Sequence, residues 1–413
     1  MKKSISFFLT CLLLFNYTIV SAEPATEEGK DAQTEGLQIE SSSAILIDAA
    51  TGQILYEKNA NERRAPASVT KVMTMLIIME ELDKENISIN DQVTVSQFAA
   101  DMGGSQLFLE PSETVSVDDL LKGIAIESAN DAAATMAEYI AVKESNLLRI
   151  PDTMAEYIAG DYQSFIGMMN EKAKELGMKD TQFMNSNGLP AEGHYSSAND
   201  IALMSKELVK YPKIHEYLTI WMTDVNVGKN DDKVRTLANT NKLLRRDNRV
   251  DGLKTGYTDD AGYCLSATAK EGSMRLISVV LDAPSSNDRF DEALQLLNYG
   301  FSQYKNETVV EENTVLDTIP INRGVKEEIN VVTKDGYSQL MLKSEKKEFK
   351  QEVKLNENIS APIAKGDKVG ELKILENGKE VTKIDLIAEE DVEKINFFNL
   401  FNKFITQFIN LSN

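Results

Sequence analysis

The stretch Ser68-Val-Thr-Lys-Val-Met-Thr-Met-Leu-Ile-Ile-Met-Glu-Glu-Leu82 carries apolar side chains on almost every side of a helical wheel. A helix that is hydrophobic all round is normally buried in the core of its domain. In its first turn the Ser68 hydroxyl and the Lys71 amine share one face, because residues three apart are neighbours on a helix. A buried amine has a lowered pKa and can take the proton of a serine, which makes the serine a nucleophile. The stretch therefore predicts a core helix that opens on a candidate nucleophile and its base.

Two further short motifs follow along the chain. Ser128-Ala-Asn130 supplies a hydroxyl that can relay a proton and an amide that can hold a substrate amide. The apolar run at 120–126 favours burial of this motif beside the core helix. Helix capping explains the similar Ser197-Ala-Asn199, because an ordinary amphipathic helix follows it. Lys254-Thr-Gly256 lies on a predicted strand. There Lys254 and Thr255 can bind a carboxylate, and Gly256 lets the backbone of a substrate lie close to the strand.

The segments around the core helix predict an α/β (α+β) domain over residues 41–306. Apolar runs on both sides of Ala49-Ala-Thr-Gly52 indicate a hairpin, helical patterns dominate residues 117–220, and a helix is expected at 288–304. Two early and three late strands around a helical middle predict a five-stranded antiparallel sheet with a helical region. The late strands are expected at residues 254–258, 263–269 and 274–282.

The sequence pattern changes in residues 309–388. Short apolar runs at residues 328–333, 337–342, 353–355 and 369–375 alternate there with the turns Lys334-Asp-Gly336, Lys365-Gly-Asp367 and Asn377-Gly378. This pattern predicts a small all-β domain. It contains no set of residues that suggests chemistry, so we interpret it as a spacer or a docking module.

The N-terminal residues 1–22 have the pattern of a secretory signal peptide, with two lysines, an apolar run and small residues at a cleavage site. The alternative is a retained membrane anchor, for which the run is short. Residues 23–40 are acidic and lack apolar periodicity, which predicts a flexible linker. Export of a chain with only two cysteines, Cys11 and Cys264, is typical of a bacterial envelope protein.

The C-terminal residues 391–413 predict an amphipathic helix. Five phenylalanines between residues 397 and 408 fall on one stripe, and asparagines fill much of the opposite half. Polar residues at every third or fourth position exclude a transmembrane span. The stripe favours a helix that lies in the membrane interface, at the outer face of the cytoplasmic membrane. Packing of the stripe on the protein's own core or on a partner is the alternative.

One segment is duplicated. Thr135-Met-Ala-Glu-Tyr-Ile-Ala141 recurs unchanged as Thr153-Met-Ala-Glu-Tyr-Ile-Ala159. There is no third copy, so the repeat indicates a duplication and not a solenoid. Pro151 would break a continuous helix between the copies. We expect residues 142–159 to form a surface excursion or an extra short helix without a catalytic role.

The composition excludes several classes of function. The chain has 413 residues, of which 44 are basic and 65 acidic, and its formal net charge is −21. Nucleic acid is not an expected partner, because phosphate binding needs clustered Lys and Arg. Two histidines and two cysteines without ligand spacing predict neither a metal site nor a cofactor.

Together, the three motifs in this order form the penicillin-recognising serine set. With the flanks Gly103-Gly-Ser-Gln106, Asn187-Gly-Leu-Pro190 and Lys254-Thr-Gly-Tyr-Thr258, the chain resembles the D-alanyl-D-alanine carboxypeptidases, which are low-molecular-mass penicillin-binding proteins. The resemblance covers about residues 40–390 and extends to the family's terminal amphipathic anchor. It implies a serine transpeptidase/β-lactamase-like catalytic domain. Glu127 departs from the family pattern, since a smaller residue is commoner there.

The resemblance also implies an acyl-transfer mechanism. Ser68 would attack the carbonyl between two terminal D-alanines, with Lys71 as general base. The backbone N–H groups of Ser68 and Tyr257 would form the oxyanion hole. Ser128 would relay a proton and, with Lys254, complete the network. Water would then release the shortened peptide.

The remaining site residues would bind the substrate, which the resemblance identifies as a peptidoglycan stem peptide. Asn130 would orient the peptide, and Gly256 would let its backbone approach the strand. Thr255 would bind the terminal carboxylate, helped by Arg289. β-Lactams are the implied inhibitors.

Three other functions stay open at this point. A serine β-lactamase shares all three motifs, but residues 131–253 lack the Glu-x-x-x-Asn pattern that one large class uses for deacylation. A DD-endopeptidase shares the site and differs in its cleft. A non-enzymatic envelope scaffold would be expected if the duplication had disabled the fold.

Overall fold

The computed structural model describes residues 37–145, 154–229 and 233–396. The expected signal peptide and most of the acidic linker lie outside these residues. The phenylalanine stripe, from residue 397 onward, also lies outside them. Residues 391–396, the expected start of that helix, are described and are not helical, because Val392 and Lys394 form bridges with Ile363 and Gly324 instead.

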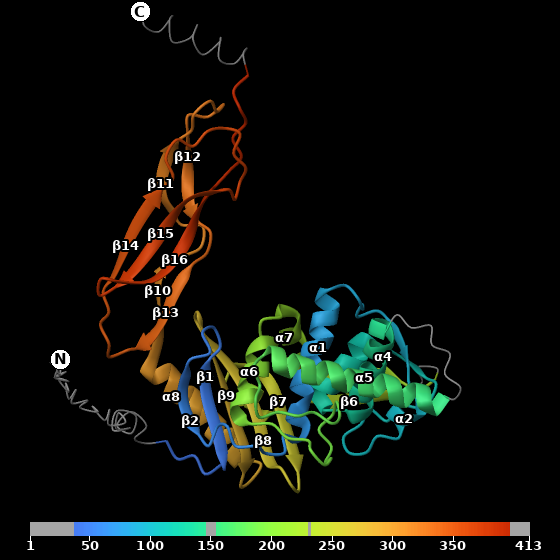
Figure 1. The fold of residues 1–413 in the computed structure, drawn as a ribbon. Coiled ribbons are helices and arrows are strands. Elements are labelled where there is room, and N and C mark those ends of the chain that lie inside the picture. Colours follow the sequence, from blue (N-terminus) through green and yellow to red (C-terminus); the bar gives the residue numbers. More distant parts are fainter. Residues whose placement is uncertain (1–36, 146–153, 230–232, 397–413) are drawn as a thin grey trace, which may run out of the picture. The chain divides into compact units, whose positions relative to one another are not determined.

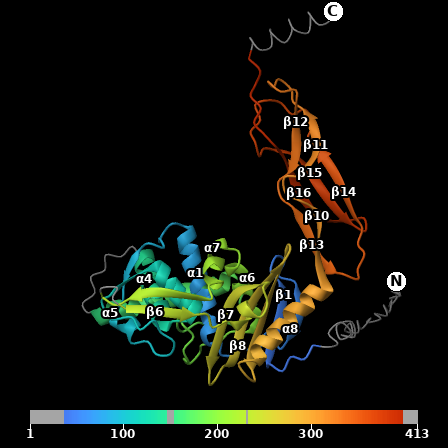
Figure 2. The ribbon, with the colours of Figure 1, turned by 180° about the vertical axis from the view of Figure 1, so that it is seen from behind.

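A five-stranded antiparallel sheet organises the catalytic domain, as the sequence predicted. Its strand order is β2-β1-β9-β8-β7. β1 is buried along its whole length, so the sheet is covered on both faces. Helix α8 packs against β9, β8 and β1, while α6 packs against β9 and β1 from the other side (Figure 1, Figure 2). The bounds are β1 Ser43–Asp48, β2 Ile54–Lys58, β7 Val250–Thr258, β8 Gly262–Glu271, β9 Met274–Ala283, α6 Ala198–Leu208 and α8 Asp288–Gln303.

The predicted core helix is buried at the centre of the helical region. It begins later than expected, because Ala67–Thr70 forms a short 3-10 turn, η3, and the α-helix α1 spans Lys71–Asp83. The tighter turn fits a hydrogen bond from Val69 N to Pro66 O of 3.1 Å, three residues back. α4, α5 and α6 pack around α1, on the β7 side of the sheet (Figure 1).

The rest of the helical region consists of further helices and two small two-stranded sheets. Strand β3 pairs with β4, and β5 pairs with β6. The bounds are α2 Gln97–Ala100, α3 Val117–Lys122, η4 Gly123–Glu127, α4 Asn130–Ser145, α5 Met154–Glu175, α7 Pro212–Leu218, η5 Lys242–Arg245, β3 Gln92–Thr94, β4 Thr114–Ser116, β5 Met222–Val227 and β6 Lys233–Ala238.

The two copies of the duplicated segment differ in their place in the fold. The first copy, Thr135–Ala141, lies inside α4, and the second copy starts α5 at Met154. The second copy therefore lengthens a long helix, and the expected extra short helix does not form within the described residues. Residues 146–153, which include Pro151, lie outside the description.

The C-terminal part is all β, as predicted. Strands β10 and β13 pair with each other, and five strands form a second sheet in the order β11-β12-β16-β15-β14. Its core contains Val331, Leu372, Ile374 and Leu386. The sequence analysis identified four of these strands but not β10, β11 or β16. The bounds are β10 Tyr304–Val310, β11 Val315–Pro320, β12 Glu328–Thr333, β13 Tyr337–Leu342, β14 Phe349–Leu355, β15 Lys368–Glu376 and β16 Lys379–Ala388.

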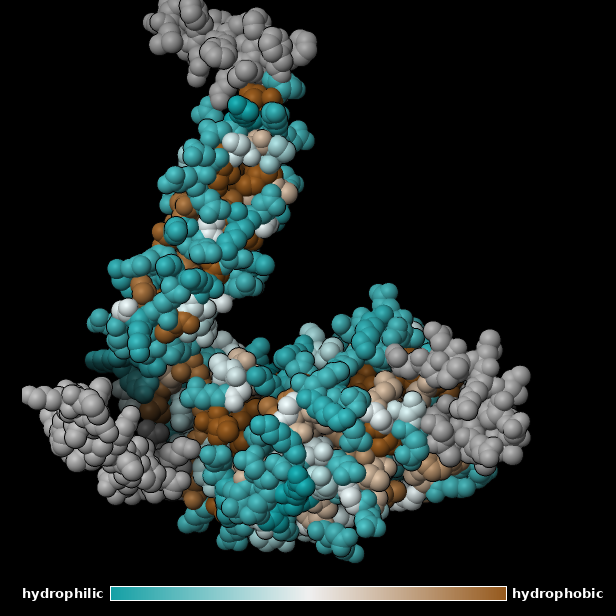
Figure 3. Space-filling model, viewed as in Figure 1, coloured by the Kyte–Doolittle hydropathy of each residue, from teal (hydrophilic) through white to brown (hydrophobic). Residues whose placement is uncertain are grey.

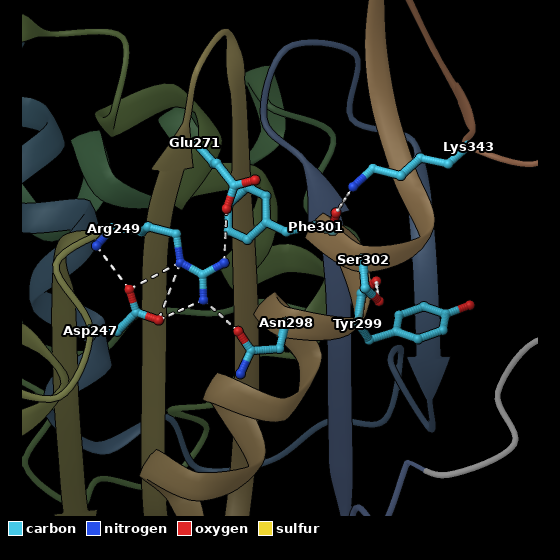
Figure 4. A network of polar contacts seen from close by, with 8 residues as sticks. All are labelled: Asp247, Arg249, Glu271, Asn298, Tyr299, Phe301, Ser302 and Lys343. Atoms are coloured by element: carbon cyan, nitrogen blue, oxygen red, sulfur yellow. Dashed lines mark hydrogen bonds and ion pairs between the residues drawn. The ribbon is translucent and has the colours of Figure 1, made fainter.

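A polar network fixes the start of β7, which carries one of the site motifs. Arg249 donates to Asp247 Oδ2 at 2.6 Å and to Glu271 Oε2 at 2.9 Å, and it also binds Asn298 of α8 (Figure 4). Lys343 donates its Nζ to the Phe301 carbonyl at 2.7 Å. This bond gives a hydrogen-bond donor to one of the carbonyls that lack a partner at a helix end. The contacts of Arg249 join the edge strand β7 to β8 and α8.

Polar residues cover much of the visible surface, in keeping with the acidic composition (Figure 3). Within the described ranges, no helix combines the length and apolar character that a membrane crossing requires.

Candidate active site

Ser68 lies where the η3 turn touches strand β7. Ala67, just before it, has a positive φ of 45°. A Cβ on Gly188 would overlap the Ala67 carbonyl oxygen, and a Cβ on Gly256 would lie 3.1 Å from Ser68 N. Both positions need glycine because the backbone of η3 approaches them so closely. The third motif is thereby held against the backbone of the first.

The Lys71 amine is fully buried and has three oxygen neighbours. Its Nζ lies 2.6 Å from Asn130 Oδ1, 2.6 Å from the Asn187 carbonyl and 3.1 Å from Ser68 Oγ. The pKa of Lys71 lies well below its usual value, mainly because the amine is buried and secondly because Lys254 is charged. The carboxylate of Asp131 opposes this shift. The amine is thus placed and tuned to exchange a proton with the serine.

Asn130 is oriented from both ends of its amide. Its Oδ1 faces Lys71, and its Nδ2 donates to the Gly103 carbonyl at 2.6 Å. The neighbouring Asp131 is buried and accepts hydrogen bonds from Leu107 N at 3.0 Å and from Leu109 N at 3.1 Å. Asp131 therefore fixes the loop at residues 103–109, whose Gly103 carbonyl binds the Asn130 amide.

The hydroxyl of Ser128 is buried but has no hydrogen-bond partner among the described residues. Ser128 follows the π-helical turn η4 with a left-handed φ of 67°. A buried polar group without a partner costs about 1–3 kcal/mol. No hydrogen bond joins this hydroxyl to Ser68, Lys71 or Lys254 in the described structure, so the expected relay is not formed here.

Lys254 and Thr255 lie side by side on β7, and both are buried. Lys254 Nζ donates to the Thr255 carbonyl at 3.0 Å, and Thr255 Oγ1 donates to Thr240 Oγ1 at 2.8 Å. Burial lowers the pKa of Lys254 to about 7; Arg289 adds to this shift and Glu127 opposes it. The protonated form of Lys254 and the Arg289 guanidinium thus make this part of the site electropositive, which suits a carboxylate ligand.

Arg289 and Tyr257 make contacts within the protein that the motifs alone do not reveal. Arg289 Nη1 donates to the Gly256 carbonyl at 2.9 Å, and no hydrogen bond joins it to Thr255 within the described residues. The Tyr257 ring is half exposed and lies against Tyr263, with centroids 4.5 Å apart. The Tyr257 side chain therefore packs on Tyr263, and the backbone N–H of Tyr257 stays the candidate for the oxyanion hole.

The sequence analysis missed three contributors to the site: the Asn187 carbonyl, Asp131 and His194. His194 Nδ1 accepts from Met184 N at 3.0 Å, and His194 Nε2 lies 2.8 Å from Thr70 Oγ1. Burial lowers the pKa of His194 to about 4. An acidic residue directly after Asn130 was the available signal for Asp131. Asn187 begins one of the flanks that support the family resemblance, but nothing local in the sequence marks its carbonyl or His194.

Cys264 is fully buried, as expected for a small core residue. Burial raises the pKa of its thiol to about 11. Its thiol is therefore unreactive at neutral pH, because the thiolate is the reactive form.

Comparison with known proteins agrees with this geometry. The family described as D-alanyl-D-alanine carboxypeptidase matches residues 28–150 and 152–285, and the C-terminal domain of penicillin-binding protein 5 matches residues 304–394. The chain belongs to the D-alanyl-D-alanine carboxypeptidase family. The match covers the described parts of the catalytic domain up to the end of the sheet.

Individual relatives in the carboxypeptidase family align over nearly the whole chain. D-alanyl-D-alanine carboxypeptidase DacF of Bacillus subtilis is 41% identical over 404 residues, which is 98% of each chain. The Escherichia coli enzyme DacC is 36% identical and covers 94% of this chain and 91% of its own.

Solved structures of similar proteins share the fold. Penicillin-binding protein 5 from Haemophilus influenzae has a TM-score of 0.63 at 29% identity, over 86% of this chain and 98% of its own. The PBP3 structure from Streptococcus pneumoniae has a TM-score of 0.67 at 26% identity, over 86% of this chain and all of its own. The carboxypeptidase fold predicted from the three motifs is thereby confirmed.

Proposed function

We propose that this chain is a serine-type D-alanyl-D-alanine carboxypeptidase that removes the terminal D-alanine of peptidoglycan stem pentapeptides through an acyl-enzyme on Ser68. The observation that carries this proposal is the 3.1 Å separation of Lys71 Nζ and Ser68 Oγ in a buried site. Family membership supports the reaction class.

The surroundings of Lys71 support its role as general base. A neutral amine has two N–H donors and one lone pair. The Asn130 side-chain oxygen and the Asn187 carbonyl, both at 2.6 Å, accept the two N–H groups. The lone pair then faces the Ser68 hydroxyl and can take its proton, and burial keeps the amine neutral.

Acylation follows from this proton transfer. Ser68 Oγ attacks the carbonyl carbon between the two D-alanines, and the backbone N–H groups of Ser68 and Tyr257 stabilise the developing oxyanion. The C–N bond breaks, and the leaving amine receives the proton through Ser128, whose unpaired hydroxyl is available for this step. Water, activated by Lys71, then attacks the ester and frees Ser68.

The electropositive end of the site would hold the substrate carboxylate. Thr255 and Lys254 would bind it directly, because a carboxylate can replace the contacts that these side chains now make within the protein. Arg289 contributes charge and fixes Gly256, and Asn130 orients the peptide amide.

We place the enzyme outside the cytoplasm, where its peptidoglycan substrate lies. The signal-like residues 1–22 and the amphipathic pattern of residues 397–413 support export and attachment to the outer face of the cytoplasmic membrane. β-Lactams, which resemble the substrate, would acylate Ser68.

The test is intact mass against time after addition of benzylpenicillin, with Ser68→Ala as the control. A persistent adduct that Ser68→Ala lacks, together with D-alanine release from a pentapeptide, is the expected result. An adduct that disappears while the drug is consumed would identify a β-lactamase. Folded protein without an adduct or D-alanine release would overturn the proposal.

A further inference from the structure

A buried tyrosine of α5 binds the loop that leads to the candidate active site. Tyr162 is 5% exposed, and its hydroxyl accepts a hydrogen bond from Ser186 N at 2.9 Å. The same hydroxyl lies 3.1 Å from Ser186 Oγ, which donates to the Ala133 carbonyl of α4 at 3.4 Å. Because the single proton of the serine hydroxyl goes to Ala133, Tyr162 is the donor to Ser186 Oγ. The phenol thus uses both its donor and its acceptor on one residue of the loop.

The backbone of Ser186 is held from a second direction by the core helix. Thr74 Oγ1 of α1 donates to the Ser186 carbonyl at 2.6 Å. Thr74 and Ser186 are both fully buried, so these bonds form away from competing water. Tyr162 therefore fixes the peptide group before Ser186, and Thr74 fixes the peptide group after it.

The next carbonyl along this loop contacts the candidate base. Asn187 O lies 2.6 Å from Lys71 Nζ, and Lys71 Nζ lies 3.1 Å from Ser68 Oγ. Lys71 and Thr74 are three positions apart on α1 and so are neighbours on one face of the helix. The loop contacts Lys71 through a backbone carbonyl, and the direction of a carbonyl depends on the peptide groups that precede it. The bonds of Tyr162 and Thr74 thus bear on the position of the Lys71 amine.

We propose that Tyr162 is a positioning residue for acyl transfer, whose hydroxyl holds residues 186–187 so that the Asn187 carbonyl orients Lys71 toward Ser68. This inference rests on the proposed function, in which a neutral Lys71 takes the proton of Ser68. A neutral amine that loses one of its two acceptors is free to turn its lone pair away from the serine. Tyr162 itself touches neither Ser68 nor Lys71 and acts through the loop.

The tyrosine ring also has a packing role, which the test must separate from the role of the hydroxyl. Tyr162 meets Phe98 of α2 edge to face, with ring centroids 4.9 Å apart. Tyr162→Phe keeps the ring and this contact, and it removes only the hydroxyl. The buried Ser186 N–H then loses its acceptor, so the loop must shift to find another.

The test is the pH profile of the benzylpenicillin acylation rate, measured by intact mass. In Tyr162→Phe we expect the maximal rate to fall about tenfold, because the base is misplaced. We also expect the acidic limb to move to lower pH. A carbonyl stabilises a charged amine more than a neutral one, so its loss lowers the pKa of Lys71 further. Lys254 and Asp131, the other charged groups that act on this pKa, stay in place.

Tyr217→Phe is the matched control. Tyr217 is 4% exposed, and its hydroxyl donates to Asp118 Oδ1 of α3 at 2.7 Å. The control therefore removes an equally buried tyrosine hydroxyl that does not bind the loop, and its acylation profile should match that of wild-type protein. Thr74→Val removes the second bond to Ser186 and should move the acidic limb in the same direction as Tyr162→Phe does.

The outcomes separate this proposal from the proposed function. A wild-type profile in Tyr162→Phe, or a lower rate with an unmoved limb, would overturn the positioning role, as would the same change in Tyr217→Phe. If Tyr162→Phe does not fold, Thr74→Val decides, and an unmoved limb in that variant overturns the role. Wild-type protein that neither forms the penicillin adduct nor releases D-alanine would refute the proposed function itself.

Discussion

His194 Nε2 and Thr70 Oγ1 lie 2.8 Å apart in the core, and Thr70 directly precedes the candidate base Lys71. Met184 N donates to the other ring nitrogen, Nδ1, at 3.0 Å. Since Nδ1 accepts, the proton of the neutral ring is on Nε2, which donates to the Thr70 hydroxyl. The imidazole thus joins the loop before α6 to the turn that carries the nucleophile.

This relationship predicts a pH-dependent stability. The pKa of His194 falls from 6.5 to about 4 on folding. Between these values the unfolded chain binds more protons, so stability is fully present above about pH 6.5 and is lost as the pH falls toward 4. The loss should be about 3 kcal/mol.

Urea unfolding of wild-type protein and His194→Gln across this pH range measures the effect. The variant should show a smaller loss, and His215→Gln, which removes the other histidine, should behave like wild type. Equal pH dependence of wild type and His194→Gln would contradict the assignment.

The two buried amines predict a shift in the pH profile of acylation. The charge of Lys254 helps to lower the pKa of Lys71. Replacing Lys254 by Gln should therefore raise the pKa of Lys71 and move the acidic limb of the benzylpenicillin acylation rate to higher pH. Lys254→Arg retains a charge and should keep the limb close to its wild-type position. An unmoved limb in Lys254→Gln would mean that the two amines are not coupled.

We expect the substitution Gly188→Ala to lower both the stability of the protein and its rate of acylation. It has a φ of +86°, and a Cβ there would overlap the Ala67 carbonyl beside Ser68. Gly193 has a similar φ of +79°, but a Cβ there would meet nothing closer than 3.8 Å. The cost of Gly193→Ala should be about 1–2 kcal/mol, from the backbone conformation alone.

Gly188→Ala should cost more and should also slow acylation, because Ser68 N must move. Chemical denaturation and the benzylpenicillin acylation rate measure the two effects. If both variants lose the same stability and acylate at the wild-type rate, the contact between Gly188 and η3 is not important for the site.

The duplication predicts a tolerated deletion. Removing residues 142–159 joins Ala141 of α4 to Gly160 of α5 and leaves one copy of the repeated segment. All the site residues lie outside this segment, so acylation of Ser68 should proceed at a comparable rate. Intact mass after benzylpenicillin addition checks this. A folded deletion variant without an adduct would assign the segment a part in the site.

Local patterns in the sequence were sufficient for much of the architecture. The late strands at 254–258, 263–269 and 274–282 lie within β7, β8 and β9, because apolar runs and turn residues carry strand signals locally. β16 was missed, since its exposed positions are rich in charged residues, which dilute that signal. β11 was missed because it buries only Ile319 and so lacks an apolar alternation. The start of α1 was placed three residues too early because the sequence does not distinguish a 3-10 turn from the first turn of an α-helix.

The sequence by itself determined the order of the three motifs, and with it the family, because Ser68, Lys71, Asn130 and Lys254 are recognised by short spacings. Only the tertiary structure decided their partners. The Asn187 carbonyl reaches Lys71 across 116 positions of the chain, and Arg289 reaches the Gly256 carbonyl across 33 positions. Such contacts depend on how α1, β7 and the intervening loops pack together, and no local spacing encodes the packing of segments so far apart in the chain.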